Sequence, residues 1–170
     1  MINIIGLRGN IKDVDDFLKK IGSFASKNNL IIQVFNADLI YGKNHIISAV
    51  EHAKRAIKRK TNTTNSLEKE ILLYASGERQ LKLAIPKMGI KEGKGNVAIL
   101  TIEESKSKTS KQISNDLMKL FKLERDDNVL EGNDDTLRKF GINKNELKTV
   151  TKAKYGDLIL EKVAMVDIIK

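Results

Sequence analysis

The sequence contains no cysteine and only one proline among its 170 residues. The absence of cysteine excludes disulfide bonds, thiolate zinc sites and a cysteine nucleophile, and it suits a reducing compartment. No apolar run approaches the length of a membrane-spanning helix. The chain opens directly into the short strand-like run MINIIGL, and no signal peptide is visible. We therefore expect a cytoplasmic protein with no membrane partner.

Recognisable catalytic motifs are also missing. The two histidines, His45 and His52, do not have the spacing of metal ligands. The loop KEGKGN at 91–96 lacks the spacing and the terminal Lys-Ser/Thr of a phosphate-binding loop. The acidic connector at 124–135 lacks the residue order of a calcium loop. We expect a binding protein with no catalytic residue, metal, cofactor or small-molecule substrate; an enzyme of unknown type that uses Glu78 or the acidic connector is the alternative.

The composition that is present fits one soluble globular domain spanning residues 1–170. Hydrophobic residues make up 41% of the chain and charged residues 31%, which argues against a disordered protein. The formal net charge is +9, from 31 Lys and Arg against 22 Asp and Glu. This excess favours an acidic partner, and RNA is favoured over a membrane because no strongly amphipathic terminal helix is present.

Hydrophobic periodicity predicts an α+β fold. Period-two or continuous apolar runs predict strands, and apolar residues three and four apart predict helices. We predict a small, largely antiparallel sheet of three to four strands packed with about seven to eight helices. The strands are expected at 2–8, 30–35 and 96–103, and helices at 13–28, 44–60, 67–76, 81–88, 107–122 and 136–140.

Residues 65–90, NSLEKEILLYASGERQLKLAIPKMGI, are predicted to form two helices that meet at a tight corner. Asn65 is expected to cap the first helix. Gly77 is expected to end it, because glycine adopts positive φ without steric cost. Gly89 is expected to end the second helix in the same way. The buried side of the second helix is expected to consist of Leu81, Ala84, Ile85 and Met88.

The corner itself, residues 76–80, is a candidate anion-binding site. A helix N-terminus presents unpaired N–H groups and partial positive charge. Arg79 adds a planar fork of donors suited to a phosphate or a base edge, and Gln80 is able to read a nucleobase. The alternative is a helical hairpin whose polar corner is simply solvated.

Two further segments carry an unusual pattern. The helix predicted at 44–60 ends in KRAIKRK, and five cations within seven residues exceed what is needed to offset a helix dipole. This run indicates either a solvated face or a contact with a polyanion. The segment 143–170 is apolar for a chain end, so it either docks on its own domain or meets another protein.

The runs IISAVEHAKRA (46–56), NSLEKEILLYASGERQLKLAI (65–85), MGI (88–90) and NVAILTI (96–102) resemble the smallest regulatory subunit of the KEOPS complex, the TPRKB-like family. The resemblance implies a non-catalytic subunit of the machinery that makes threonylcarbamoyl-adenosine in tRNA. It further implies that the protein binds and supports the kinase-like ATPase subunit. Archaeal members of the family also bind tRNA through the unpaired CCA end of the acceptor stem.

The resemblance and the residue patterns together give two sets of candidate site residues. A cationic ridge beside the glycine-broken corner is expected to bind RNA, through Arg55, Lys58, Arg59, Lys60, Ser76, Gly77, Glu78, Arg79 and Gln80. The apolar C-terminal segment is expected to bind the kinase-like subunit, through Leu147, Val150, Tyr155, Leu158, Ile159, Lys162 and Val163. A helix-turn-helix protein is the alternative for residues 44–90. The run Leu81, Leu83, Ala84 and Ile85 argues against it, as too apolar for an exposed recognition helix.

Overall fold

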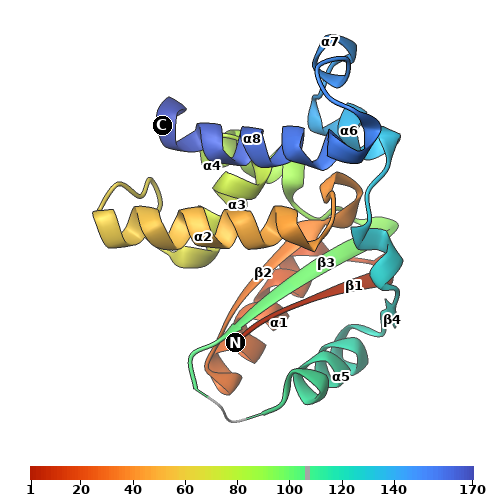
Figure 1. Cartoon of the computed structure of the whole chain (residues 1–170). Coiled ribbons are helices and arrows are strands. Elements are labelled where there is room, and N and C mark those ends of the chain that lie inside the picture. Colours follow the sequence, from red (N-terminus) through yellow and green to blue (C-terminus); the bar gives the residue numbers. More distant parts are fainter. Residues whose placement is uncertain (106–107) are drawn as a thin grey trace.

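The computed structural model describes residues 1–105 and 108–170, and it is built on a four-stranded sheet with helices on both faces (Figure 1). β3 (Gly93–Glu103) lies between β1 (Ile2–Ile11) and β2 (Leu30–Asn36). The short β4 (Glu124–Arg125) pairs with the other side of β1. All three strand pairs are antiparallel, which confirms the predicted α+β class and sheet.

Two layers of helices cover the sheet, and the described residues contain eight α-helices in all. α1 (Val14–Asn28) and α5 (Ser110–Phe121) lie on one face, with α1 behind the strands and α5 below them in Figure 1. The other face carries α2 (Lys43–Arg59), α3 (Leu67–Ser76), α4 (Leu81–Met88), α6 (Asp134–Phe140), α7 (Lys144–Leu147) and α8 (Tyr155–Ile169). Three 3₁₀ turns, Ala37–Leu39, Asp127–Leu130 and Lys152–Lys154, join these elements.

The strands divide the core in two because their side chains alternate between the faces. Ile5 and Ile99 pack with α1 and α5, whereas Ile4, Phe35 and Leu100 pack with the helices of the other face. The second cluster is the larger, and α3 lies inside it with every residue from Glu70 to Ser76 buried. Three of the six buried residues of α2 are alanines, Ala49, Ala53 and Ala56, and their small side chains allow α3 to approach closely.

The corner between α3 and α4 forms where it was predicted. Gly77 ends α3 with φ of 69°, so the prediction for this glycine is confirmed. Three details of these helices differ from the prediction. Ser66, not Asn65, precedes α3, and it makes no side-chain capping bond. Gly89 is extended, with φ of −67°, so it ends α4 without the left-handed conformation. Ile85 is 54% exposed, because only Ala84 and Met88 of α4 turn fully inward.

Several other elements also have boundaries that differ from the prediction by a few residues. The helix expected to begin at residue 107 begins, as far as the structure describes it, at Ser110, and residue 107 lies outside the described residues. Strand β1 continues three residues beyond its predicted end, to Ile11, because β3 supplies a partner along its whole length. In the part of the chain that is described, no helix has the length and apolar character needed to cross a bilayer.

Candidate functional site

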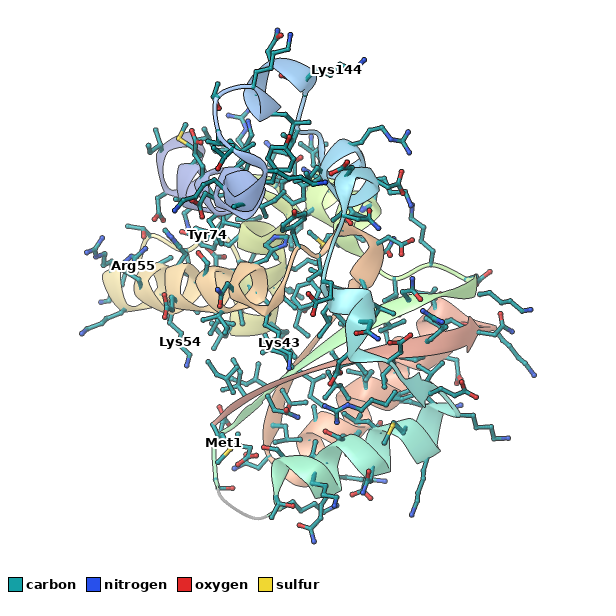
Figure 2. All side chains as sticks on the ribbon, turned by 45° about the vertical axis from the view of Figure 1, so that its right-hand side comes forward. Met1, Lys43, Lys54, Arg55, Tyr74 and Lys144 are labelled. Atoms are coloured by element: carbon teal, nitrogen blue, oxygen red, sulfur yellow. The ribbon has the colours of Figure 1, made fainter. Side chains whose placement is uncertain are left out.

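A group of exposed cations marks the C-terminal end of α2. Lys54, Arg55, Lys58, Arg59 and Lys60 are all exposed, and Figure 2 shows Lys54 and Arg55 near this end, with Lys43 at the opposite end of the helix. Lys54, Lys58, Arg59 and Lys60 form no ion pair with any described residue. We call these four residues the basic end of α2. Their charges are therefore available to an anionic partner.

Arg55 has a different environment from its neighbours. Its guanidinium lies 2.7 Å from Nδ1 of His52 and 3.7 Å from Oδ2 of Asp167 on α8. Asp167 also accepts a hydrogen bond from the Tyr74 hydroxyl and lies 2.8 Å from His52 Nδ1. Burial acts to raise the pKa of Asp167, but the Tyr74 and His52 contacts outweigh it and hold this pKa below its ordinary value. Arg55 thus joins α2 to α8, a structural role that the sequence pattern did not indicate.

The corner residues are less open than predicted. Ser76 is completely buried; its hydroxyl donates to the Leu73 carbonyl at 2.8 Å and accepts from the N–H of Glu78 at 3.2 Å. The prediction that Ser76 contacts RNA is therefore wrong, because its hydroxyl is occupied in ending α3. Gly77 is partly covered, since a Cβ atom there would lie 3.5 Å from side-chain atoms of Lys162 and of Phe140.

Several charges surround this corner. The carboxylate of Glu78 pairs with Lys87 at 3.2 Å, so Glu78 is engaged within the chain and carries a charge that repels phosphate. The Lys87 ammonium lies 4.2 Å from the centre of the Phe140 ring. Burial lowers the pKa of Lys87, and the charge of Lys162 lowers it further. Arg79 is exposed, and Gln80 precedes α4 without capping it through its side chain.

The basic end of α2 and the corner lie at opposite ends of the same helix. Nε2 of His45, near the start of α2, donates to the carbonyl of Ala75, at the end of α3, at 2.8 Å. The corner is therefore next to the start of α2, whereas Lys58 lies about 20 Å further along the helix at 1.5 Å per residue. The expectation of a ridge beside the corner is wrong, because α2 and α3 run in opposite directions.

His45 has a structural role that the sequence pattern did not reveal. It is completely buried, and its Nδ1 accepts from the N–H of Tyr41 at 3.3 Å while Nε2 donates to Ala75. Burial lowers its pKa to about 4, and the bond to Ala75 offsets this only partly. A neutral histidine thus fixes the start of α2 to the end of α3, and no local pattern signals a partner thirty residues away.

The predicted partner residues divide into two groups. Leu158, Ile159 and Val163 are buried in the core of this chain, so the expectation that they contact a partner directly is wrong. For these three residues the other expectation holds, namely that the C-terminal segment docks on its own domain, because α8 packs on α2 and α3. The other four lie nearer the surface: Leu147, Val150 and Tyr155 are half-buried against the core, and Lys162 pairs with Glu146.

Exposed apolar side chains do occur on α8, at positions that were not predicted. Ile168 is 74% exposed, and Met165 and Ile169 are also exposed. We call these three residues the outer face of α8. The apolar residues of this helix are spread around its circumference, so the sequence alone did not separate the outer face from the buried one.

Several residues of the enzyme alternative have structural partners. Asp126 pairs with Arg8 at 2.7 Å, and Asp127 accepts from the N–H of Gly6 at 2.8 Å and from Arg125. Glu78 pairs with Lys87, as described above. Among the described residues, no group of three or more His, Asp or Glu side chains is arranged to hold a metal ion. These carboxylates therefore fix loops within the part of the fold that is described.

Helix α4 is more exposed than its apolar composition predicted. The helix-turn-helix alternative was disfavoured because α4 looked too apolar to face solvent, yet Leu83 and Ile85 are 48% and 54% exposed. Apolar composition therefore does not decide whether α4 faces solvent, and this objection to a helix-turn-helix is wrong.

Comparison with known proteins provides independent evidence. The sequence model of a family described as kinase binding protein CGI-121 matches residues 9–167. A curated relative, the regulatory protein Cgi121 of Methanocaldococcus jannaschii, is 33% identical over 141 residues, which is 83% of this chain and 86% of the relative. These matches confirm the resemblance inferred from the sequence. The family match spans the basic end of α2, the corner and nearly all of α8.

Proposed function

The chain belongs to the CGI-121 family of kinase-binding proteins, and from this premise we propose that it is a non-catalytic regulatory subunit of a KEOPS complex that makes threonylcarbamoyl-adenosine in tRNA. In this proposal it binds the kinase-like ATPase subunit and supports its activity. The observation that carries the proposal is the family match over residues 9–167, which covers the basic end of α2 and the corner. The name of the archaeal relative, a regulatory protein, supports a role without catalysis.

The kinase-like subunit is proposed to bind the outer face of α8. Met165, Ile168 and Ile169 expose apolar area that the described part of the chain does not cover. Exposed apolar side chains close together are typical of protein interfaces. Leu147, Val150, Tyr155 and Lys162 are retained as partly exposed candidates near the other end of α8. The buried Leu158, Ile159 and Val163 support the contact only by fixing the helix in place.

The second part of the proposal is that the protein binds the acceptor end of tRNA. The basic end of α2 supplies cations that have no acidic partner among the described residues, as phosphate-binding groups require. The exposed Arg79 is proposed to meet the single-stranded tail, either at a phosphate or stacked on a base. Gln80 is proposed to contact the same tail.

The distance between the basic end of α2 and the corner requires two separate contacts with the tRNA. Because the basic end and the corner are about 20 Å apart, one phosphate group cannot meet both. The duplex part of the acceptor stem is proposed to lie against the basic end, while the unpaired tail extends toward Arg79. Two separate contacts should then contribute to affinity in different ways.

The proposal is tested by measuring binding of intact tRNA, of tRNA lacking its CCA tail, and of the kinase-like subunit. We expect binding to the kinase-like subunit, binding to intact tRNA, and much weaker binding to the trimmed tRNA. Equal affinity for intact and trimmed tRNA would exclude the corner as the site of the tail. Failure to bind the kinase-like subunit would contradict the regulatory role itself.

A further inference from the structure

The two edges of the sheet differ in how their outward backbone groups are hydrogen-bonded. On the β1 side, the Gly6 carbonyl accepts from the N–H of Asp126 at 2.9 Å, and the Gly6 N–H donates to Oδ1 of Asp127 at 2.8 Å. β4 and the loop after it thus satisfy the backbone of that edge at Gly6 and pair with Leu7 and Arg8. On the other side, β2 pairs with β3 alone, and no described segment pairs with its outer edge. The sheet therefore has one edge that is occupied at its centre and one open edge, that of β2, with no strand partner among the described residues.

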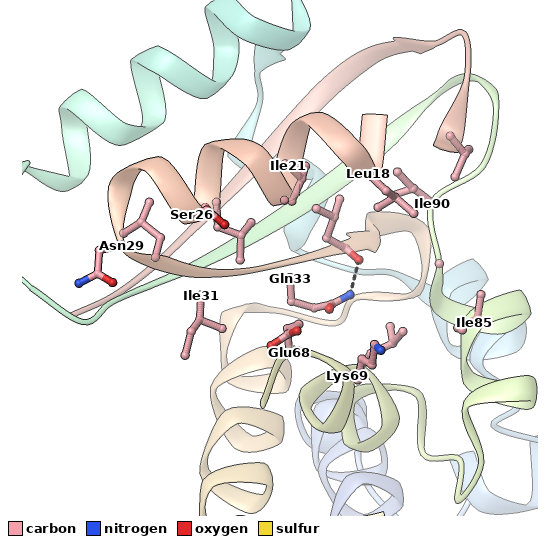
Figure 3. Close-up of a pocket in the computed structure, with 18 of the residues that line it drawn as sticks. Leu18, Ile21, Ser26, Asn29, Ile31, Gln33, Glu68, Lys69, Ile85 and Ile90 are labelled. Carbon is pink, nitrogen blue, oxygen red and sulfur yellow. Dashed lines mark hydrogen bonds between the residues drawn. The ribbon is translucent and has the colours of Figure 1, made fainter. Parts of the chain in front are cut away.

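The register shows which groups of β2 face outward. Glu104 donates its N–H to the carbonyl of Asn29, so Asn29 faces β3. Backbone groups of an antiparallel strand point to alternate sides, so Leu30, Ile32 and Val34 face away from β3. The Val34 carbonyl supports this assignment, because it accepts from the side-chain amide of Gln33 at 2.9 Å and not from a strand (Figure 3).

An apolar groove of about 690 Å³ runs along this open edge. Figure 3 shows β2 between α1 on one side and α3 on the other, with Ile31 and Gln33 at its centre. The α1 wall includes Leu18 and Ala25, and the opposite wall includes Leu72 and Ile85. Leu18 and Ile85 are both about half exposed, at 46% and 54%. Mainly apolar side chains, with the charged Glu68 and Lys69 on the α3 side, thus enclose a row of backbone donors and acceptors.

The protective features usual for an edge strand are few here. Edge strands of monomers typically carry proline, a bulge or inward-pointing charges that prevent pairing with another chain. β2 reads LIIQVFN, with no proline and no charged residue, and its seven residues pair with β3 in unbroken register. Only Gln33 covers one carbonyl, and a side-chain amide is easily displaced by a strand.

The chemistry of the groove specifies its occupant. Outward N–H and C=O groups recur at every second residue, about 7 Å apart, and an extended polypeptide backbone matches this repeat. Lipids and small molecules do not present donors and acceptors at that interval. We propose that an extended apolar segment of a partner polypeptide adds to the open edge of β2 as a fifth strand, with its side chains alternating between the α1 wall and the α3–α4 wall.

This site is separate from the kinase and tRNA surfaces proposed above. It uses α1, β2, α3 and the end of α4, whereas those proposals use the outer face of α8, the basic end of α2 and the start of α4. Loss of peptide binding would therefore leave both of those proposals unaffected.

The test uses a short synthetic peptide with the central run Val-Ile-Val-Thr-Val flanked by lysines. Two control peptides have the same sequence but carry N-methyl groups on alternate backbone nitrogens. In one control peptide the N–H groups along one edge of the extended peptide are blocked, and in the other those along the opposite edge. We expect the unmodified peptide to bind. We expect one control peptide to bind at least about tenfold more weakly, because it has lost the donors that face β2. Amide hydrogen exchange should slow at Leu30, Ile32 and Val34 and stay unchanged at Ile31 and Gln33.

Variants of the protein complete the test. Ile85→Asp and Leu18→Asp should abolish peptide binding, and both positions are exposed enough for the fold to be kept. Leu83→Asp is the matched control, since Leu83 is 48% exposed on the same helix but does not line the groove. The inference is overturned if both methylated control peptides bind as well as the unmodified peptide, if Leu83→Asp is as harmful as Ile85→Asp, or if the peptide does not bind.

Discussion

The ammonium group of Lys170, beyond the end of α8, lies 2.8 Å from Oε1 of Glu70 on α3, and both side chains are almost completely buried. Glu70 also accepts hydrogen bonds from the N–H groups of Thr63 and Thr64, which precede α3. Burial acts to raise the pKa of Glu70, but the bonds from Lys170 and Thr64 outweigh it and lower this pKa. The end of α8 is therefore bound to the start of α3 by a buried ion pair.

Lys170→Ala should lower the free energy of unfolding by about 3 kcal/mol, because it leaves a buried carboxylate without its cation. Urea unfolding at pH 7 measures the effect. The double variant Glu70→Gln with Lys170→Met is the control, and it should be more stable than Lys170→Ala alone. A change below about 0.5 kcal/mol for Lys170→Ala would mean that the two threonine amides suffice for Glu70.

The buried His45 should make stability depend on pH. Its pKa is lowered to about 4 in the folded protein, so between the ordinary value of 6.5 and about 4 the unfolded chain binds a proton that the folded chain does not. The free energy of unfolding is therefore unaffected by His45 above pH 6.5. Protonation of this histidine in the unfolded chain lowers that free energy by about 3 kcal/mol as the pH drops to 4. Urea unfolding at a series of pH values measures this slope. His45→Gln should reduce this pH dependence by about one bound proton, and an unchanged slope in that variant would contradict the prediction.

Removing cations from the basic end of α2 should change how tRNA affinity depends on salt. The double variant Lys58→Ala and Arg59→Ala should lower the slope of log K against log salt by about 0.7–0.9 for each phosphate group that the variant no longer binds. Binding titrations at several salt concentrations give the slope. Lys119→Ala, on α5 at the opposite face of the sheet, is the control and should not alter it. An unchanged slope in the double variant would place the acceptor stem elsewhere.

Arg79→Ala should act on the tail of the tRNA and not on its stem. We expect the variant to bind intact tRNA about as weakly as the wild-type protein binds trimmed tRNA, a loss of about 1–3 kcal/mol if Arg79 stacks on a base. Affinity for trimmed tRNA should not change. If Arg79→Ala lowers the affinity for intact and trimmed tRNA equally, Arg79 contributes only a nonspecific electrostatic attraction to the RNA. Stability measured by urea unfolding should be unaffected, since Arg79 is exposed.

Ile168→Asp should abolish binding of the kinase-like subunit while the protein remains folded, because this side chain is 74% exposed. Leu120→Asp, an exposed apolar position on α5, is the matched control and should bind normally. Co-purification and circular dichroism give the two readouts. Leu158→Arg, by contrast, should destabilise the protein, since a charge would enter the core. Normal kinase binding by Ile168→Asp would exclude the outer face of α8 as the interface.

Local patterns were sufficient to predict most of the fold. Alternation and helical spacing located β1 to β3 and α1 to α6 to within a few residues, but not β4, α7 or α8. Gly77 marked the corner because few other residues accept its φ. The predictions failed where a residue's environment comes from distant elements. Glu70 and His45 look like surface residues in the sequence, yet Lys170 and Ala75 satisfy them across the fold. The separation of Arg79 from Lys58 likewise follows from the packing of α2 on α3, which no local pattern encodes.

The centre of the sheet has a consequence for synthesis of the protein. β1 and β3 pair from Ile2 opposite Ile102 to Ile11 opposite Gly93, so the first strand made must await a partner made much later. A nascent chain that has released β1, α1 and β2 holds no complete sheet, and its apolar strands remain exposed until β3 leaves the ribosome. Long-range pairing of this kind slows folding and invites aggregation. Chaperone dependence during translation should therefore be greatest before residue 103 has emerged.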